Sequence, residues 1–166
     1  MDEFKKVVRL NPYSFIFHVN MGRALLRQEK LIEALTEFNR ARKLGCKLAD
    51  VYCDIAYIHS RLGETEKAIK TYDEVLKIDP LFYRAHFELG EIYMNKESWD
   101  QASTEFYKVV QLRPDYALAY YDLGLVYSKK GFKEKAIEEF KSFLEYSKDE
   151  SLKEQVKGWI IELCSQ

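Results

Sequence analysis

Glycine and proline are scarce in this sequence, with 7 and 3 in 166 residues. An all-β fold needs many tight turns, and these two residue types supply most of them. Aromatic residues are by contrast abundant at 14%, and 47% of all residues are hydrophobic. The composition therefore predicts a globular, helix-rich chain with a continuous core and argues against disorder.

Neither sign of charge dominates, because 26 basic residues balance 27 acidic ones and leave a formal net charge of -1. Such a chain has no global field to attract phosphate backbones or an anionic bilayer, so we expect neither nucleic acid nor membrane partners. No window approaches the about 18 apolar residues of a membrane span, and the start MDEFKKVVRL has no signal-peptide core. Three cysteines without a disulfide-framework spacing favour a reducing compartment, and we expect a cytoplasmic protein.

The strongest pattern is an internal repeat with a period of 34 residues, visible when ELGEIYMNKESWDQASTEF (88–106) is set against DLGLVYSKKGFKEKAIEEF (122–140). Small residues recur at two places of four successive copies: Gly22, Ala56, Gly90 and Gly124, then Ala34, Ala68, Ala102 and Ala136. A large aromatic residue recurs at Phe38, Tyr72, Phe106 and Phe140. Each copy contains two stretches with apolar residues at helical spacing, which predicts a pair of amphipathic helices. Gly63 and Gly131 lie at the break between them, where a left-handed residue ends a helix.

This pattern resembles the tetratricopeptide repeat family, whose helix-turn-helix unit has the scheme W-x2-L-G-x2-Y followed by Ala, Phe, Ala and Pro. The fourth copy matches it with Tyr120, Leu123, Gly124, Tyr127, Ala136 and Phe140. The resemblance implies an all-α, right-handed α-solenoid of helix-turn-helix repeats. The expected segments are 1–12 as the second helix of an incomplete repeat, repeats at 15–48, 49–82, 83–116 and 117–148, and a capping helix at 149–166.

Close packing explains why the small and large residues recur together. Helix backbones approach to about 8 to 10 Å only where a contact residue is small. We therefore expect Gly90 and Ala102 at such contacts, with the Phe106 ring filling the space opposite.

The two ends of the array differ in character. The C-terminal stretch places Leu152, Val156, Trp159, Ile160 and Leu163 on one helical face, which predicts a solvating cap, with Asp149 or Ser151 as its N-cap. The segment 1–12 matches only the second helix of a repeat. Either the chain is a piece of a longer array, or residues 1–11 pair with another molecule and make a homo-oligomer.

In the family, the first helices line a concave groove, so the resemblance places a candidate binding surface on them. The sixth places of the four repeats hold Asn20, Asp54, Glu88 and Asp122, a ladder of one amide and three carboxylates. The candidate groove residues are Val19, Asn20, Arg23, Asp50, Asp54, Tyr57, Arg84, Phe87, Glu88, Glu91, Tyr121, Asp122 and Leu125.

Apolar groups interleaved with fixed charge are typical of a surface that holds a peptide or helix. We expect a protein partner with hydrophobic anchors and some basic residues, steered by the three carboxylates of the ladder and anchored on Tyr57, Phe87 and Tyr121. In an alternative interpretation, basic residues of the same groove neutralise its acids: Arg23, Arg27, Arg61, Arg84 and Lys129.

Acids at the places where co-chaperone repeats hold carboxylates argue against binding of Hsp70 or Hsp90 C-terminal tails. Catalysis has no support either, because His18, His59 and His86 occupy packing positions of their repeats. Cys46, Cys53 and His59 match no zinc spacing, so we expect no metal, no cofactor and no enzymatic activity. The sequence thus predicts a non-catalytic interaction scaffold or adaptor. Two alternatives stay open: a self-assembling structural subunit, and a docking region of a larger regulator or enzyme.

Overall fold

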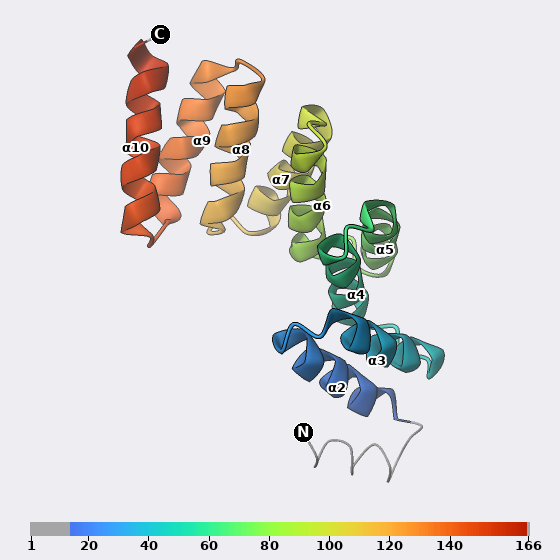
Figure 1. The fold of residues 1–166 in the computed structure, drawn as a ribbon. Helices are drawn as coiled ribbons and strands as arrows, with labels where there is room; N and C mark the ends of the chain where they lie inside the picture. Colours follow the sequence, from blue (N-terminus) through green and yellow to red (C-terminus); the bar gives the residue numbers. More distant parts are fainter. Residues whose placement is uncertain (1–13, 166) are drawn as a thin grey trace. The chain divides into compact units, whose positions relative to one another are not determined.

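The computed structural model describes residues 14–165, which contain nine α-helices and no strand (Figure 1). The chain divides into two compact units, Met1–Phe82 and Tyr83–Gln166. The predicted half repeat at 1–12, and the self-association expected of it, lie outside the described residues. The all-α class is confirmed, and it follows from the helical spacing of apolar residues in every copy.

From residue 14 on, unit 1 contains two helical hairpins. Its helices are α2 (Phe15–Arg27), α3 (Leu31–Lys43), α4 (Ala49–Arg61) and α5 (Thr65–Ile78). The ring of Phe38 and the side chains of Val51, Ile55 and Ile58 are buried in a core shared by α2, α3 and α4.

Unit 2 consists of two further hairpins and a last single helix. Its helices are α6 (Tyr83–Asn95), α7 (Trp99–Leu112), α8 (Ala117–Lys129), α9 (Lys133–Tyr146) and α10 (Glu150–Ser165). Phe106, Val109 and Leu123 are buried between α6, α7 and α8, and Phe140 and Phe143 are buried between α9 and its neighbours.

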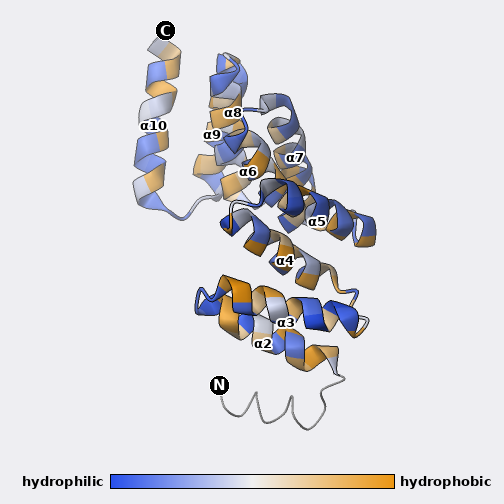
Figure 2. Ribbon diagram, turned by 45° about the vertical axis from the view of Figure 1, so that its right-hand side comes forward, coloured by the Kyte–Doolittle hydropathy of each residue, from blue (hydrophilic) through white to orange (hydrophobic). Residues whose placement is uncertain are grey.

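Each helix carries both hydrophobic and hydrophilic residues, as Figure 2 shows along the individual ribbons. The small residues of the first helices are what allow close approach within a hairpin. A Cβ built on Gly90 would lie 2.6 Å from Cε1 of Phe106, and one built on Gly22 would lie 2.7 Å from Cε1 of Phe38. The expected contact between Gly90 and Phe106 is therefore confirmed, and no larger residue fits there without displacing the ring.

The turn inside each hairpin uses one left-handed residue, and these residues also recur with the period of the repeat. Gly63 and Gly131 have φ of 76° and 77°, as the sequence predicted, but Glu29 and Glu97 adopt φ of 58° and 56° at the equivalent places. At Glu97, the backbone N–H donates to the carbonyl of Met94 at 3.0 Å, and the next N–H reaches back to Tyr93 at 2.8 Å. This paired bonding is the Schellman motif, which satisfies the last carbonyls of a helix.

The last helix, α10, begins after a side-chain cap. The Oδ1 atom of Asp149 accepts a hydrogen bond from the backbone N–H of Leu152 at 3.0 Å, so Asp149 is the N-cap that the sequence offered as one of two choices. Val156 is fully buried, and Leu152, Trp159, Ile160 and Leu163 pack around it against the preceding hairpin. The predicted apolar face of α10 is thus confirmed.

Candidate functional site

In unit 1, an ion pair joins the first helices of consecutive hairpins. Arg23 on α2 donates from Nε to Oδ2 of Asp54 on α4 at 3.1 Å. The Asp54 side chain is 11% exposed and that of Arg23 is 42% exposed. A nearly buried carboxylate is therefore paired with a partly exposed guanidinium. Within unit 1, the pairing agrees with the alternative interpretation, in which basic residues balance the acids.

The other candidate residues of unit 1 take different positions. Val19 is buried in the core, whereas Asn20 and Asp50 are exposed. Tyr57 is half-buried, and its hydroxyl accepts a hydrogen bond from Nη1 of Arg61 at 2.8 Å. The guanidinium of Arg61 also lies over the Tyr57 ring, 5.7 Å from its centroid.

In unit 2, the same two places hold acids. Asp122 on α8 occupies the sixth place of its repeat, as Asp54 does in unit 1. Glu91 on α6 occupies the ninth place of the preceding repeat, as Arg23 does in unit 1. Asp122 is only 8% exposed, and among residues 14–165 its carboxylate has no hydrogen-bond partner. Where unit 1 has an attractive pair, unit 2 has two carboxylates that repel each other.

The pKa values of both acids of this acidic pair, Glu91 and Asp122, are raised. Burial raises the pKa of Asp122 from 3.8 to about 7, and the charge of Glu91 adds to the effect. Burial also raises the pKa of Glu91, with a further contribution from Glu88. Removing a carboxylate from water without a compensating cation disfavours its charged form, and a neighbouring carboxylate disfavours it further.

Two tyrosine hydroxyls lie within electrostatic range of these carboxylates. Burial raises the pKa of the Tyr116 hydroxyl, with contributions from Tyr83 and from the three carboxylates Glu91, Glu88 and Asp122. Burial and Asp122 likewise raise the pKa of Tyr121. The hydroxyls of Tyr116 and Tyr121 are therefore close enough to the carboxylates for the charges to disfavour their ionisation.

The remaining candidates in unit 2 take different positions. Phe87 is 9% exposed and packs in the core. Its ring centroid lies 5.6 Å from that of Phe106 and 5.1 Å from that of Tyr116, so it contacts both rings. Glu88 is half-buried and Arg84 is exposed. Leu125 is half-buried one helical turn after Asp122 and packs against the core of the last hairpin.

Chemically, the acidic pair can hold a cation. Within the described residues, no three His, Cys, Asp or Glu side chains come close enough to ligate a metal ion. A guanidinium or ammonium group fits better, because its N–H donors satisfy carboxylate oxygens one by one, as Arg23 does for Asp54.

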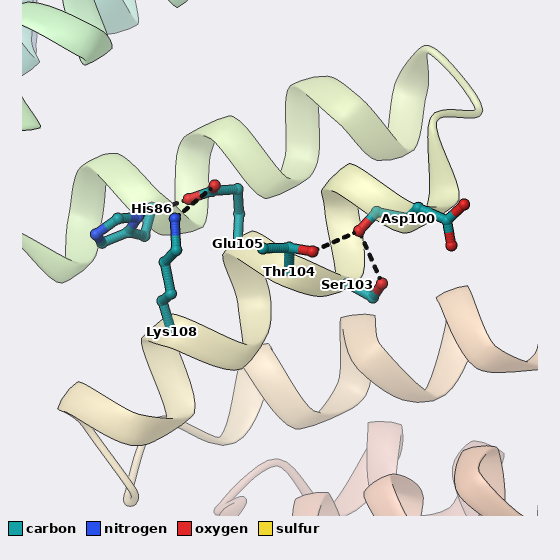
Figure 3. A network of polar contacts seen from close by, with 6 residues as sticks. All are labelled: His86, Asp100, Ser103, Thr104, Glu105 and Lys108. Atoms are coloured by element: carbon teal, nitrogen blue, oxygen red, sulfur yellow. Dashed lines mark hydrogen bonds and ion pairs between the residues drawn. The ribbon is translucent and has the colours of Figure 1, made fainter.

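A second set of polar contacts was not foreseen from the sequence. Figure 3 shows His86 on α6 and Lys108 on α7 both contacting Glu105, with Nδ1 of His86 2.6 Å and Nζ of Lys108 2.9 Å from its two oxygens. Burial alone would raise the pKa of Glu105, but the hydrogen bonds from His86 and Lys108 hold it below its ordinary value. Nearby, Ser103 and Thr104 donate to the carbonyl of Asp100 (Figure 3).

Unit 1 contains the same arrangement, in which His18 and Arg40 both contact Glu37. We call each such group of one glutamate and two basic residues a tie. These histidines are nearly buried and connect the two helices of a hairpin, which is a structural role. The separation of 19 residues between His and Glu occurs in both ties and is the sequence signal that could have revealed them.

The last hairpin keeps only the glutamate of this tie. Glu139 occupies the place of Glu105, but Tyr120 stands where His86 would be and Ser142 where Lys108 would be. Burial, with help from Glu138, raises the pKa of Glu139 to about 7. A half-buried carboxylate without its two usual partners is left partly protonated at neutral pH.

Comparison with known families agrees with this architecture. A model described as TPR repeat matches residues 61–97 and 90–131, and a model described as Tetratricopeptide repeat matches residues 117–150. The matched region, 61–150, is more than half of the chain. Repeat proteins of this family are generally non-catalytic interaction modules. Across the helices of residues 14–165, none is both long and apolar enough to cross a membrane.

Individual relatives are distant. The chain is 23% identical over 105 residues to Tetratricopeptide repeat protein 6 of Homo sapiens, covering 63% of this chain and 20% of that protein. It is 25% identical over 81 residues to the Hsp70-Hsp90 organizing protein of Triticum aestivum, covering 49% of this chain and 14% of that protein. The chain thus spans a fifth or less of these curated relatives.

Solved structures share the fold at similar distance. YrrB, described as a TPR protein with an unusual peptide-binding site, has a TM-score of 0.76 and 22% identity, covering 93% of this chain and 80% of that one. Repeated hairpins, the packing of glycine on phenylalanine and the matched family models lead to one conclusion: the chain belongs to the tetratricopeptide repeat family.

Proposed function

We propose that this protein is a non-catalytic adaptor that binds a segment of another protein, and that Glu91 and Asp122 in unit 2 hold a Lys or Arg side chain of that segment. The observation that carries the proposal is that two acids in unit 2 occupy the places that hold a basic residue and an acid, joined in an ion pair, in unit 1. Arg23 and Asp54 satisfy each other in unit 1, and the equivalent places in unit 2 are Glu91 and Asp122.

The internal ion pair supplies a template for the contact. Arg23 and Asp54 hold the ninth and sixth places of consecutive repeats, the places that Glu91 and Asp122 hold in unit 2. A guanidinium from a partner would enter the space between two carboxylates, within electrostatic range of the Tyr116 and Tyr121 hydroxyls. Such a charge-assisted contact in a poorly hydrated place is stronger than the same contact on an open surface.

Binding of a cation should also be linked to protonation. The pKa of Asp122 is about 7 because burial and Glu91 disfavour its charge. A bound guanidinium favours the charged form, so it lowers this pKa and releases a proton near neutral pH. We therefore expect affinity to rise with pH between about pH 6 and about pH 8.

The same charges bear on the partners of one relative. The Hsp70-Hsp90 organizing protein is named for two chaperones, but the match covers only 14% of it. Glu91 and Asp122 would repel a terminal carboxylate, so we propose basic internal segments as partners in place of acidic chaperone tails.

The test uses a phage-displayed dodecapeptide library selected on the whole chain, followed by calorimetry with the recovered peptides. Selected peptides should contain Arg or Lys beside large apolar residues. Glu91→Arg should supply its own guanidinium to Asp122, as Arg23 does in unit 1, and lower the affinity at least tenfold.

Glu134→Arg is the matched control. Glu134 is exposed on the second helix α9, and the substitution changes the net charge by the same amount. We expect this variant to bind as the wild type does. Equal loss in both variants would reduce the effect to net charge, and no loss in Glu91→Arg would refute the proposed site.

A further inference from the structure

A cavity of about 360 Å³ opens between the last hairpin and α10. Its apolar lining comes from Leu125 on α8, Phe140 on α9, and Trp159 and Leu163 on α10, while Lys133 and Glu162 place opposite charges among its lining groups. A space of this size, with two aromatic rings and two leucines beside its polar lining residues, can take an apolar group.

This cavity adjoins the acidic pair through α8. Leu125 follows Asp122 by one helical turn on the same helix. Tyr121 directly precedes Asp122 on α8, and its ring packs against Trp159, a lining residue of the cavity, at a centroid distance of 5.9 Å. The acidic pair and the cavity are therefore neighbouring parts of unit 2, joined by Tyr121.

The geometry points to a second recognition site: the cavity between α8, α9 and α10 takes a large apolar side chain, Phe or Leu, of the same basic segment. This inference rests on the proposed function, in which Glu91 and Asp122 hold the basic residue. Helix α10 is then a wall of the binding site as well as a cap. The negative charge of the acidic pair beside an apolar cavity favours a segment in which basic and apolar residues are close together.

The spacing of the two residues follows from helix geometry. The two sites are separated by about one interhelical distance, about 8 to 10 Å, and by about one turn, or 5 Å, along α8. An extended peptide covers about 3.3 Å per residue. The apolar residue should therefore follow or precede the basic one by about three positions.

The probes are three blocked decapeptides of Ser and Gly that carry Arg alone, Phe alone, or Arg followed three positions later by Phe. The readout is the indole N–H signal of Trp159, with Trp99 on α7 as an internal reference. We expect both Phe peptides to move the Trp159 signal and leave Trp99 in place. The peptide with both residues should bind at least tenfold more tightly than either single-residue peptide, because the second contact becomes intramolecular.

A matched pair of variants tests the cavity itself. Ser128 lines the cavity near the end of α8, so Ser128→Phe should fill it without removing core atoms. Lys129→Phe places the same ring on the next residue, which does not line the cavity. Ser128→Phe should remove the added affinity from Phe, and Lys129→Phe should keep it.

The possible results separate the two proposals. If Phe adds no affinity or leaves Trp159 unmoved while the Arg peptide still loses binding in Asp122→Asn, the cavity inference is wrong and the acidic pair stands. If Phe peptides move Trp159 but the Arg peptide is indifferent to Asp122→Asn, the cavity stands and the proposed role of the pair fails. If no peptide binds, or if Ser128→Phe binds as tightly as Lys129→Phe, the cavity inference is refuted.

Discussion

Replacing Asp122 with Asn tests, without a ligand, the energetic basis of the proposed binding surface. The pKa of Asp122 is raised from 3.8 to about 7 in the folded protein, so folding favours its protonated form. Asn has the shape of the protonated acid and does not ionise. We therefore expect Asp122→Asn to match the wild type at low pH and to exceed its stability at high pH.

The difference in unfolding free energy between the variant and the wild type follows from the proton uptake of Asp122 in the folded and unfolded states. Below about pH 4, Asp122 is mostly protonated in both states and the two proteins should differ by less than about 1 kcal/mol. Between about pH 4 and about pH 7, the unfolded wild type loses its proton while the folded one keeps it, so its unfolding free energy falls. At about pH 8, the accumulated difference is about 4 kcal/mol in favour of the variant.

The assay is urea unfolding of both proteins, followed by far-ultraviolet circular dichroism at about pH 4 and about pH 8. Glu139, whose pKa is also about 7, adds the same slope to both proteins and cancels in the comparison. A stability difference that does not change with pH, or a wild type that is the more stable protein at about pH 8, would refute the account of Asp122.

Two further predictions concern packing and the incomplete polar tie. Gly90→Ala should lower the unfolding free energy by about 1 to 3 kcal/mol, because the new Cβ would lie 2.6 Å from a buried ring. Gly158→Ala, with no atom within 4 Å of its new Cβ and a site inside α10, should raise it by about 0.5 to 1 kcal/mol, so opposite shifts of the urea midpoint are expected and shifts of one sign would contradict the packing account. Ser142→Lys should supply Glu139 with a cation at the place that Lys108 holds beside Glu105 and raise stability by about 1 kcal/mol at about pH 8, and no gain relative to about pH 4 would show that the tie cannot be rebuilt.

The fold was predictable because each hairpin repeats the same local instructions. Gly90 and Phe106 could be paired from their recurrence alone, and Gly63 and Gly131 from their place after a helix. Glu97 escaped this reasoning because glutamate is not a residue typical of left-handed turns, although it occupies the same place of the repeat as Gly63 and Gly131.

The proposed binding surface was less predictable, since identical residues at equivalent places of two repeats differ in their surroundings. Asp54 and Asp122 both lie at sixth places, and the sequence grouped them in one ladder. Their difference comes from the residue on the preceding first helix, Arg23 for one and Glu91 for the other. Which residue of the preceding hairpin lies beside each aspartate depends on how two hairpins stack, and the groove positions of a single repeat do not give this information.

The central claim is that Asp122 and Glu91 hold a basic side chain of a partner. The most direct test is an NMR titration of the Asp122 side-chain carboxyl carbon, in the free protein and with a saturating amount of the decapeptide that carries Arg and Phe. The account predicts a pKa of about 7 in the free protein and a clearly lower value in the complex. An unchanged pKa in the complex, or an ordinary carboxyl pKa in the free protein, would contradict it.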